Sequence, residues 1–292
     1  MKLKFLLITL LLCNILLAQK NILIIPPKSN YDSSHNYFYT ILEKSLNKNN
    51  IDINILFSKK MEQGRALVEL KNNKSIDVFW AGTSIQREKE LRAIKIPLVK
   101  GLLGYRVFII NKDNKNSFDK IISLDQLKKF KVCQGTYWPD TEILEESGFN
   151  VIKNTNYEAM FLQVSTKRCD FFPRGINEAY SEIKVRKASY PEIMLYDKII
   201  LYYPFPVYFF VSKENEELAL KIEKGLLQMI EDGSFDDHLK QNTTTKHLYP
   251  ISKWHSNKIF KIPNPLLSPN TNIKDPKFWI VPMEDLNVDT LP

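Results

Sequence analysis

The chain is poor in the residues that usually build metal, disulfide or nucleotide sites. Among its 292 residues there are only three cysteines, Cys13, Cys133 and Cys169, and no pair has the CxxC spacing of a structural zinc site. The nine glycines are too few for a collagen-like chain and form no GxGxxG or Walker loop, and GxSxG and HExxH are also absent. We therefore expect no metal and no cofactor, and no motif of the chain predicts an enzyme.

Long apolar runs are also scarce. One begins at Phe5, behind two lysines, and ends near Ala18, which is shorter than the ~20 residues that span a bilayer. This pattern predicts a secretory signal peptide over residues 1–18, with a soluble periplasmic protein left after cleavage. A retained anchor is the alternative interpretation. Cys13 follows a leucine rather than the small residue of a lipoprotein box, so lipid attachment is not expected.

Neither composition nor charge points to a nucleic acid partner. Hydrophobic residues make up 44% of the chain and charged residues 25%, which is typical of a soluble globular protein, and the length fits about two domains. The net charge is +8, from 41 basic and 33 acidic residues, yet the lysines are scattered and interleaved with acids. We interpret them as a solvated surface and expect no nucleic acid partner.

Hydrophobic periodicity predicts two successive α/β units. In the first, apolar runs at 21–25, 51–57 and 76–80 predict strands, and helical spacing at 37–46 and 61–70 predicts the helices between them. This β-α-β-α-β order implies a parallel sheet. The later predicted elements are strands at 105–111, 131–134, 151–152, 169–172 and 207–211, and helices at 124–130, 141–147, 157–166, 177–186 and 216–232.

The residue composition of the chain changes at about residue 241. Prolines recur beyond this point and predict that no regular element forms there. The aromatic residues Trp254, Phe260, Phe278 and Trp279 argue against disorder. We expect an irregular C-terminal extension over 241–292 that is pinned to the folded body by its aromatic side chains.

The two α/β halves are joined by apolar strands at 105–111 and 205–212. The phrases KVCQGT, RCDFF and EDGSF follow one another along the chain between residues 131 and 235. With this order, residues 20–240 resemble the type 2 periplasmic solute-binding proteins of family 3, the amino-acid type. The resemblance implies a two-lobed α/β fold in which 19–107 and 205–240 form lobe 1 and 108–204 form lobe 2.

The same resemblance implies a binding protein rather than an enzyme. Such a protein is a monomer that closes on a small ligand, anionic or amino-acid-like, and serves an ABC transporter or a sensor kinase. Two alternatives stay open at this point. One is a secreted dehydratase-like enzyme on the same fold, with Glu178 as the candidate general base. The other is a scaffold or adaptor that binds no ligand.

The ligand site of such a fold lies off the carboxyl ends of the sheet strands. Three strand ends supply the candidate ligand-binding residues Thr83, Ser84, Arg87, Gln134, Thr136, Tyr137, Trp138 and Arg174. Arg87 can form a two-pronged hydrogen bond with a carboxylate, and the loop after Gly135 can bring backbone amides close to an anion. The structural alternatives are an exposed helix face for Arg87, a helix cap for Thr136 and core positions for Tyr137 and Trp138.

Arg174 stands where amino-acid binders of the resembled family place an acid that holds the ligand ammonium. An ion pair with Glu178 at the start of a helix is one interpretation. If Arg174 instead faces the cleft, it adds a second guanidinium opposite Arg87, and the two repel each other unless an anion lies between them. That arrangement favours an anionic ligand, and Arg174→Ala is then expected to abolish binding while the fold stays intact.

Cys133 and Cys169 fall on predicted strands of the same lobe. A disulfide between them is one possibility in an oxidising periplasm. We expect two free thiols instead, because adjacent parallel strands rarely give suitable disulfide geometry.

Overall fold

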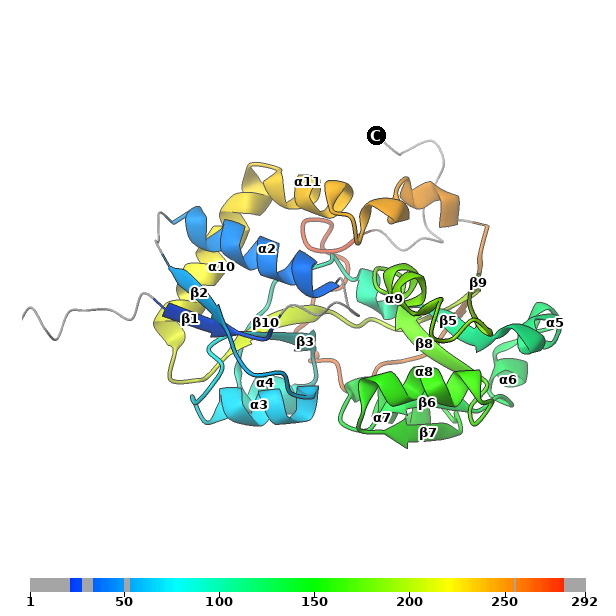
Figure 1. The fold of residues 1–292 in the computed structure, drawn as a ribbon. Helices are drawn as coiled ribbons and strands as arrows, with labels where there is room; N and C mark the ends of the chain where they lie inside the picture. The colour runs from blue at the N-terminus through cyan, green and yellow to red at the C-terminus, as the bar shows by residue number, and fades with distance from the viewer. Residues whose placement is uncertain (1–21, 28–33, 50–52, 255, 281–292) are drawn as a thin grey trace, which may run out of the picture.

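The computed structural model describes residues 22–27, 34–49, 53–254 and 256–280. Two lobes lie side by side, each with its own strands and helices (Figure 1). The predicted signal peptide over 1–18 falls outside the described residues. Within the described ranges, no helix combines the length and the apolar character that a membrane crossing requires.

The first lobe contains two small sheets. In one, β1 (Ile22–Ile25) pairs in parallel with β2 (Asn54–Phe57), as the sequence pattern predicted. In the other, β10 (Val207–Val211) runs antiparallel between β3 (Phe79–Gly82) and β4 (Arg92–Ile94). The expectation of a wholly parallel sheet is therefore wrong for β3. The reason is that β10 returns from the second lobe in the opposite direction and takes the place beside β3.

Five helices cover these strands: α2 (Ser34–Asn47), α3 (Gln63–Lys71), α4 (Ile85–Glu90), α10 (Glu216–Glu231) and α11 (Ser234–Gln241). The two longest, α2 and α10, pack closely because α10 carries Gly225 at the contact. A Cβ at Gly225 would lie 1.8 Å from the carbonyl oxygen of Ser45 on α2. A glycine inside a helix costs roughly 1 kcal/mol relative to alanine, and here it allows backbone contact between two helices.

The second lobe is built on a six-stranded sheet in the order β11-β9-β5-β8-β6-β7. Its strands are β5 (Tyr105–Asn111), β6 (Val132–Gly135), β7 (Val151–Asn154), β8 (Phe171–Gly175), β9 (Ile193–Tyr202) and β11 (Lys258–Lys261). Its helices are α5 (Lys115–Asp119), α6 (Leu124–Leu127), α7 (Pro139–Glu146), α8 (Tyr157–Ser165) and α9 (Ala179–Arg186). The sequence pattern missed β9, which carries Asp197 and Lys198 in its middle and so breaks the apolar run that the prediction relied on.

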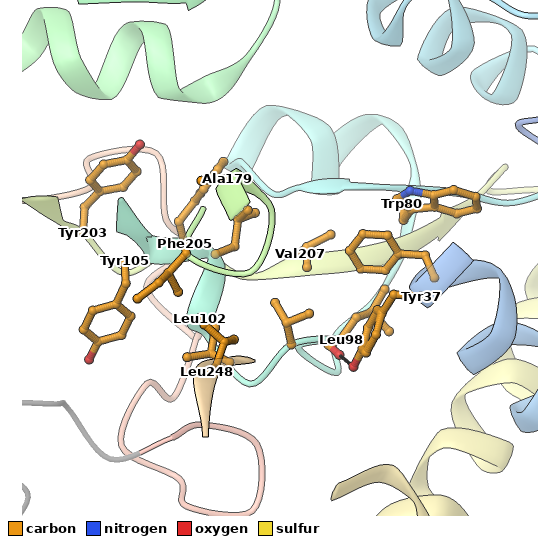
Figure 2. Packing of buried hydrophobic residues seen from close by; sticks show 14 of the residues in the cluster. Tyr37, Trp80, Leu98, Leu102, Tyr105, Ala179, Tyr203, Phe205, Val207 and Leu248 are labelled. Carbon is orange, nitrogen blue, oxygen red and sulfur yellow. Dashed lines mark hydrogen bonds between the residues drawn. The ribbon is translucent and has the colours of Figure 1, made fainter. Parts of the chain in front are cut away.

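Two of the chain segments that connect the lobes are packed into apolar core. The first linker, residues 95–104, joins β4 to β5, and the second linker, residues 203–206, joins β9 to β10. Figure 2 shows Leu98 and Leu102 of the first linker in one cluster with Tyr203 and Phe205 of the second. The hydroxyl of Tyr37 donates a 2.6 Å hydrogen bond to the carbonyl of Leu98. The region between the lobes is therefore a well-packed part of the molecule.

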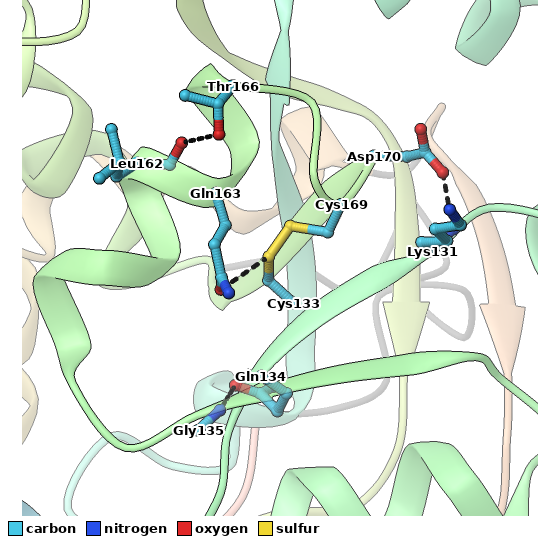
Figure 3. The surroundings of a disulfide bond; sticks show 9 residues. All are labelled: Lys131, Cys133, Gln134, Gly135, Leu162, Gln163, Thr166, Cys169 and Asp170. Carbon is cyan, nitrogen blue, oxygen red and sulfur yellow. Dashed lines mark hydrogen bonds between the residues drawn. A yellow bond between two sulfur atoms is a disulfide. The ribbon is translucent and has the colours of Figure 1, made fainter.

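Cys133 and Cys169 form a disulfide, with their Cα atoms 5.7 Å apart (Figure 3). The expectation of two free thiols is wrong. Cys133 lies on β6, but Cys169 lies in a bend before β8 begins at Phe171. Because Cys169 is outside the strand ladder, its Cα and side-chain direction are free of the parallel-strand geometry on which the expectation rested.

The C-terminal extension contains regular structure, contrary to expectation. It forms two short 3-10 helices, η3 (Lys246–Leu248) and η4 (Ile251–Trp254), and the strand β11, which pairs in parallel with β9 at the edge of the second-lobe sheet. The expected aromatic anchoring is confirmed, since Trp254 and Trp279 are buried. The prolines therefore limit the length of the elements without preventing them.

Candidate functional site

A cavity of about 430 Å³ lies between the lobes and is lined by residues from both. Its aromatic lining consists of Phe38, Phe79, Trp80, Trp138, Tyr157 and Phe205. Its charged lining includes Arg87 from the first lobe and Arg106, Asp140, Glu158, Arg174 and Glu178 from the second. A volume of this order is typical of small-molecule sites, and the wall combines aromatic rings with many charged groups, Lys60 and Glu62 of the first lobe included.

Arg87 is the buried cation of the first-lobe wall. Ser84 caps the start of α4 by accepting a 3.1 Å hydrogen bond from the Arg87 amide, so that Arg87 lies in the first turn of this helix. The guanidinium donates to the carbonyl of Gly82 (2.5 Å), to Gln63 Oε1 (2.7 Å) and to the carbonyl of Tyr137 (3.0 Å). Arg87 is thus buried in the cavity wall, and the interpretation as an exposed helix face is wrong.

The charge of Arg87 is not neutralised by a neighbouring acid. Among the residues that the structure describes, no carboxylate lies within 4.0 Å of its guanidinium nitrogens, and all its hydrogen bonds go to neutral oxygens. Burial lowers the pKa of Arg87 to about 10, with Asp140 opposing the shift. The group therefore stays charged near neutral pH, and a ligand carboxylate would supply the missing counter-charge.

Arg174 on β8 has a different environment. Its Nε donates to both carboxylate oxygens of Glu182, at 3.0 and 2.9 Å, and its Nη2 lies 2.9 Å from Glu178. Burial alone would lower the pKa of Arg174, but the two carboxylates raise it well above its ordinary value. The guanidinium also lies 5.1 Å from the ring of Trp138.

These contacts correct the expectation of two unneutralised guanidinium groups facing one anion. The alternative, an ion pair between Arg174 and Glu178, is confirmed, and Glu182 adds a second carboxylate to it. Two carboxylates on one guanidinium leave this side of the cavity with a surplus of negative charge. A contact between Arg174 and a ligand stays a prediction.

Sequence reasoning missed a second buried ion pair in the cavity wall. Arg106 at the start of β5 lies 2.6 Å from Asp140 of α7, and the hydroxyl of Tyr203 donates to the same carboxylate oxygen at 2.5 Å. Arg106 is only 1% exposed. A lone arginine within the apolar run of β5 was the available signal, because a buried arginine requires a carboxylate partner.

The lobes also touch directly beside the cavity. The ring of Tyr137 lies against Gly64 of α3, where an added Cβ would be 3.0 Å from Tyr137 Cδ2. A smaller neighbouring cavity is lined by Gly64 and its neighbours and by Thr136, Tyr137 and Trp138. Together with the bond from Arg87 to the Tyr137 carbonyl, this contact joins the loop after β6 to the first lobe.

The predicted site residues divide into three groups. Arg87, Trp138 and Arg174 line the main cavity, and Thr136 and Tyr137 line the smaller one. Thr83, Ser84 and Gln134 are not among the lining residues of either. Thr83 Oγ1 donates to Glu88, Ser84 serves as the helix cap, and Gln134 Oε1 accepts from the Gly135 amide. The strand ends were therefore placed correctly, while these three side chains act within their own lobes, and their part in binding stays a prediction.

The part of the chain described here contains no group of three or more His, Cys, Asp or Glu side chains placed to hold a metal ion.

Solved structures share this architecture. An ancestral arginine-binding protein bound to arginine matches with a TM-score of 0.57 at 20% identity, over 76% of this chain and 97% of that one. The chain has the two-lobed fold of type 2 periplasmic binding proteins. The substrate-binding protein of an amino acid ABC transporter matches with a TM-score of 0.54 at 15% identity, over 75% of this chain and 98% of its own.

A histidine kinase sensor domain with similarity to periplasmic binding proteins also matches, with a TM-score of 0.55 at 13% identity, over 74% of this chain and 92% of that domain. No family model and no curated protein matches the chain. At these identities the likeness establishes the fold alone. Each structure is covered almost whole, while about a quarter of this chain lies outside the match.

Proposed function

We propose that this protein is a solute-binding protein whose two lobes close on a small amino-acid-like ligand. The observation that carries the proposal is Arg87, a buried guanidinium without a carboxylate partner among the described residues, in the wall of an aromatic cavity between the lobes. A hydrogen bond between ions contributes about 1.5–3 kcal/mol. A ligand carboxylate at Arg87 would therefore form an ionic hydrogen bond that is stronger than the bond of a water molecule at the same place.

The opposite wall defines the other end of the ligand. Arg174 is shared by Glu178 and Glu182, and Glu178 also lines the cavity. The surplus negative charge on this side suits a cationic group. We therefore favour a dipolar ligand, with its carboxylate toward Arg87 and its ammonium toward Glu178, over the purely anionic ligand that two unpaired arginines would have favoured.

Closure follows from where these groups lie. Arg87 belongs to the first lobe and Glu178 to the second, so a dipolar ligand contacts both charges only when the lobes are together. A ligand shifts a conformational equilibrium by its difference in affinity for the two states. Contacts made in the closed form alone, including the aromatic walls from both lobes, supply that difference.

The proposal extends to location and partners. Export by the predicted signal peptide over 1–18 would place the protein in the periplasm, where the closed form would be read as a monomer by an ABC transporter or a sensor kinase. Proteins of both kinds occur among the structures with this fold. Amino-terminal sequencing of the exported protein should begin near Gln19, and recovery of Met1 on membrane-bound protein would contradict export with cleavage.

The enzyme alternative is supported by one structure of the same fold, an ancestral amino-acid-binding protein described as a precursor of cyclohexadienyl dehydratase. Glu178, its candidate general base, is held by the guanidinium of Arg174 at 2.9 Å. The scaffold alternative is tested by the same experiment as the main proposal, because a scaffold gives no response to any small ligand.

Thermal unfolding in the presence of matched ligands tests the proposal. The probes are the common amino acids, together with L-phenylalanine, 3-phenylpropanoate and phenethylamine as a set that lacks one charge at a time. A ligand at one hundred times its Kd stabilises by about 2.7 kcal/mol, which raises the Tm by roughly 5–10 °C. We expect at least one amino acid to give such a shift and to exceed its singly charged analogues. No shift from any amino acid, acid or amine would overturn the proposal.

A further inference from the structure

The C-terminal extension passes from the first lobe to the second and back. It leaves α11 and reaches the second lobe at His247, whose ring lies 4.3 Å from that of Tyr180 and whose Nε2 lies 3.1 Å from the carbonyl of Ile176. The strand β11 then extends the second-lobe sheet by pairing with β9. In Figure 1 this orange to red segment runs from α11 across to β9 and returns to the centre of the molecule.

On its return the extension binds the second linker, residues 203–206. The amide of Ile262 donates to the carbonyl of Tyr202 at 3.0 Å, directly before the linker. The side-chain amide of Asn264 donates to the carbonyl of Pro204 at 2.8 Å, within it. Two residues later the carbonyl of Leu266 accepts a 2.9 Å bond from the amide of Ile85, at the start of α4 in the first lobe. The second linker is therefore bonded to a segment that is itself attached to both lobes.

The end of the described extension binds the first linker, residues 95–104. Lys100 and Gly101 have φ values of +46° and +80°, so two consecutive residues of this linker are left-handed. The amide of Ile280 donates to the carbonyl of Lys100 at 3.0 Å. The ring of Trp279, only 6% exposed, fills the space that a side chain at Gly101 would need, because a Cβ there would lie 2.2 Å from Trp279 Cε3.

We propose that the C-terminal extension is a clamp on the hinge, which restricts the opening of the two lobes by holding both linkers. Rotation of one lobe against the other requires changes in the backbone angles of a few linker residues. Here those residues are bonded to a third segment, so that opening has to break its bonds or pull Trp279 out of its site. The consequence for the binding site, slower exchange of ligand, rests on the proposed function, whereas the restriction itself does not.

The restriction is measured without any ligand. Spin labels at Val68→Cys on α3 and Leu162→Cys on α8, positions that are 55% and 48% exposed, report the distance between the lobes by electron resonance. The full chain is compared with Trp279→Ala, and Trp279→Phe is the conservative variant. The comparison variant is Phe278→Ala, which removes a neighbouring half-buried ring that packs on the core cluster but does not fill the space at Gly101.

We expect Trp279→Ala to shift the distance distribution to longer values and to broaden it, with partial rescue in Trp279→Phe and a smaller change in Phe278→Ala. Exchange of the linker amides of Leu102 and Gly104 with deuterium should accelerate by at least ~10-fold in the same variant. Unchanged distances together with unchanged exchange in Trp279→Ala would overturn the clamp.

A second measurement covers the case in which Trp279→Ala does not fold. A protease recognition sequence placed within 268–272, an irregular stretch of half-buried and exposed residues, allows the folded chain to be cut before Trp279. Release of the lobes after cutting supports the clamp, and an unchanged distance distribution with the terminal piece dissociated contradicts it. Both results are independent of whether an amino acid binds, so a failed ligand screen and a failed clamp can be told apart.

Discussion

Arg87 and Arg174 lie on opposite walls of one cavity and are buried to a similar degree, 9% and 6% exposed, yet their partners differ. Arg87 donates to three neutral oxygens, whereas Arg174 is shared by two carboxylates. An arginine that already has its counter-ions holds the fold together, and one that lacks them is available to a ligand. Their partners, rather than their burial or residue type, decide which of the two arginines is available for binding.

The largest effect is expected at Arg174, and it is an effect on stability. Arg174→Leu leaves Glu182, whose side chain is fully buried, without the cation that it accepts from. Loss of one partner of a buried ion pair costs about 3–5 kcal/mol. Urea unfolding should show this loss, whereas the sequence alone predicted that the fold stays intact without Arg174. The control Arg174→Lys keeps the charge and should lose less of the free energy of unfolding. If the leucine variant is as stable as the unsubstituted protein, the contrast between Arg174 and Arg87 is wrong.

Next in size is the disulfide, which is confined to the lobe of Arg174. Replacing Cys133 and Cys169 together by serine opens a loop with a sequence separation of 36 residues. The unfolded chain then gains entropy, and we expect a loss of roughly 2–4 kcal/mol in the free energy of unfolding. Unfolding with and without reductant provides the measurement. Thiol counting on the denatured, non-reduced protein should find neither cysteine free, and two reactive thiols would refute the bridge.

Arg87 should show the opposite behaviour to Arg174. Arg87→Gln removes a buried charge that has no acidic partner among the described residues, so we expect the free energy of unfolding to change by less than about 1.5 kcal/mol. Affinity for the amino acid that gives the largest thermal shift should fall by roughly 10–100-fold, as expected for a lost ionic hydrogen bond. Calorimetric titration separates the two effects. Undiminished affinity in this variant would assign the carboxylate site to another residue.

The smallest effect is expected at the contact between the lobes. Gly64→Ala places a methyl group about 3.0 Å from the ring of Tyr137, so that the ring must move for the lobes to meet. We expect binding to weaken a few-fold without a loss of stability. The double variant Gly64→Ala, Tyr137→Ala removes the clash and should bind no more weakly than Tyr137→Ala alone. If Gly64→Ala weakens binding equally with and without the Tyr137 ring, the added methyl group does not act through Tyr137.

Much of the fold follows from local sequence patterns. The apolar runs of β5 and β10 and the helical spacing of α2 and α10 lie where periodicity placed them, because continuous burial selects apolar residues at regular intervals. The strands β9 and β11 were not predicted, because neither consists of a continuous apolar run. β9 carries Asp197 and Lys198 in its middle, and β11 has lysines at both ends, so neither shows an apolar run.

The sequence predicted which loops border the candidate site, but it did not predict the contacts that the side chains make there. The carboxyl ends of the strands could be located from the sequence, and with them Arg87, Trp138 and Arg174 in the cavity wall. The partners of each arginine could not be located, since Glu182 lies on α9, eight residues beyond Arg174, and Asp140 on α7 is distant in sequence from Arg106. The local sequence around an arginine does not indicate whether a carboxylate will lie next to its guanidinium in the fold.

By itself, the sequence determined most of the longer elements, the succession of two α/β units and the loops that border the cavity, because these depend on periodicity within short segments. The tertiary structure decided which charges are neutralised, that Cys133 meets Cys169, and that the C-terminal extension reaches both linkers. Those contacts join residues that are far apart along the chain. Their distances depend on how whole elements pack against one another, and no local pattern of residue types encodes that packing.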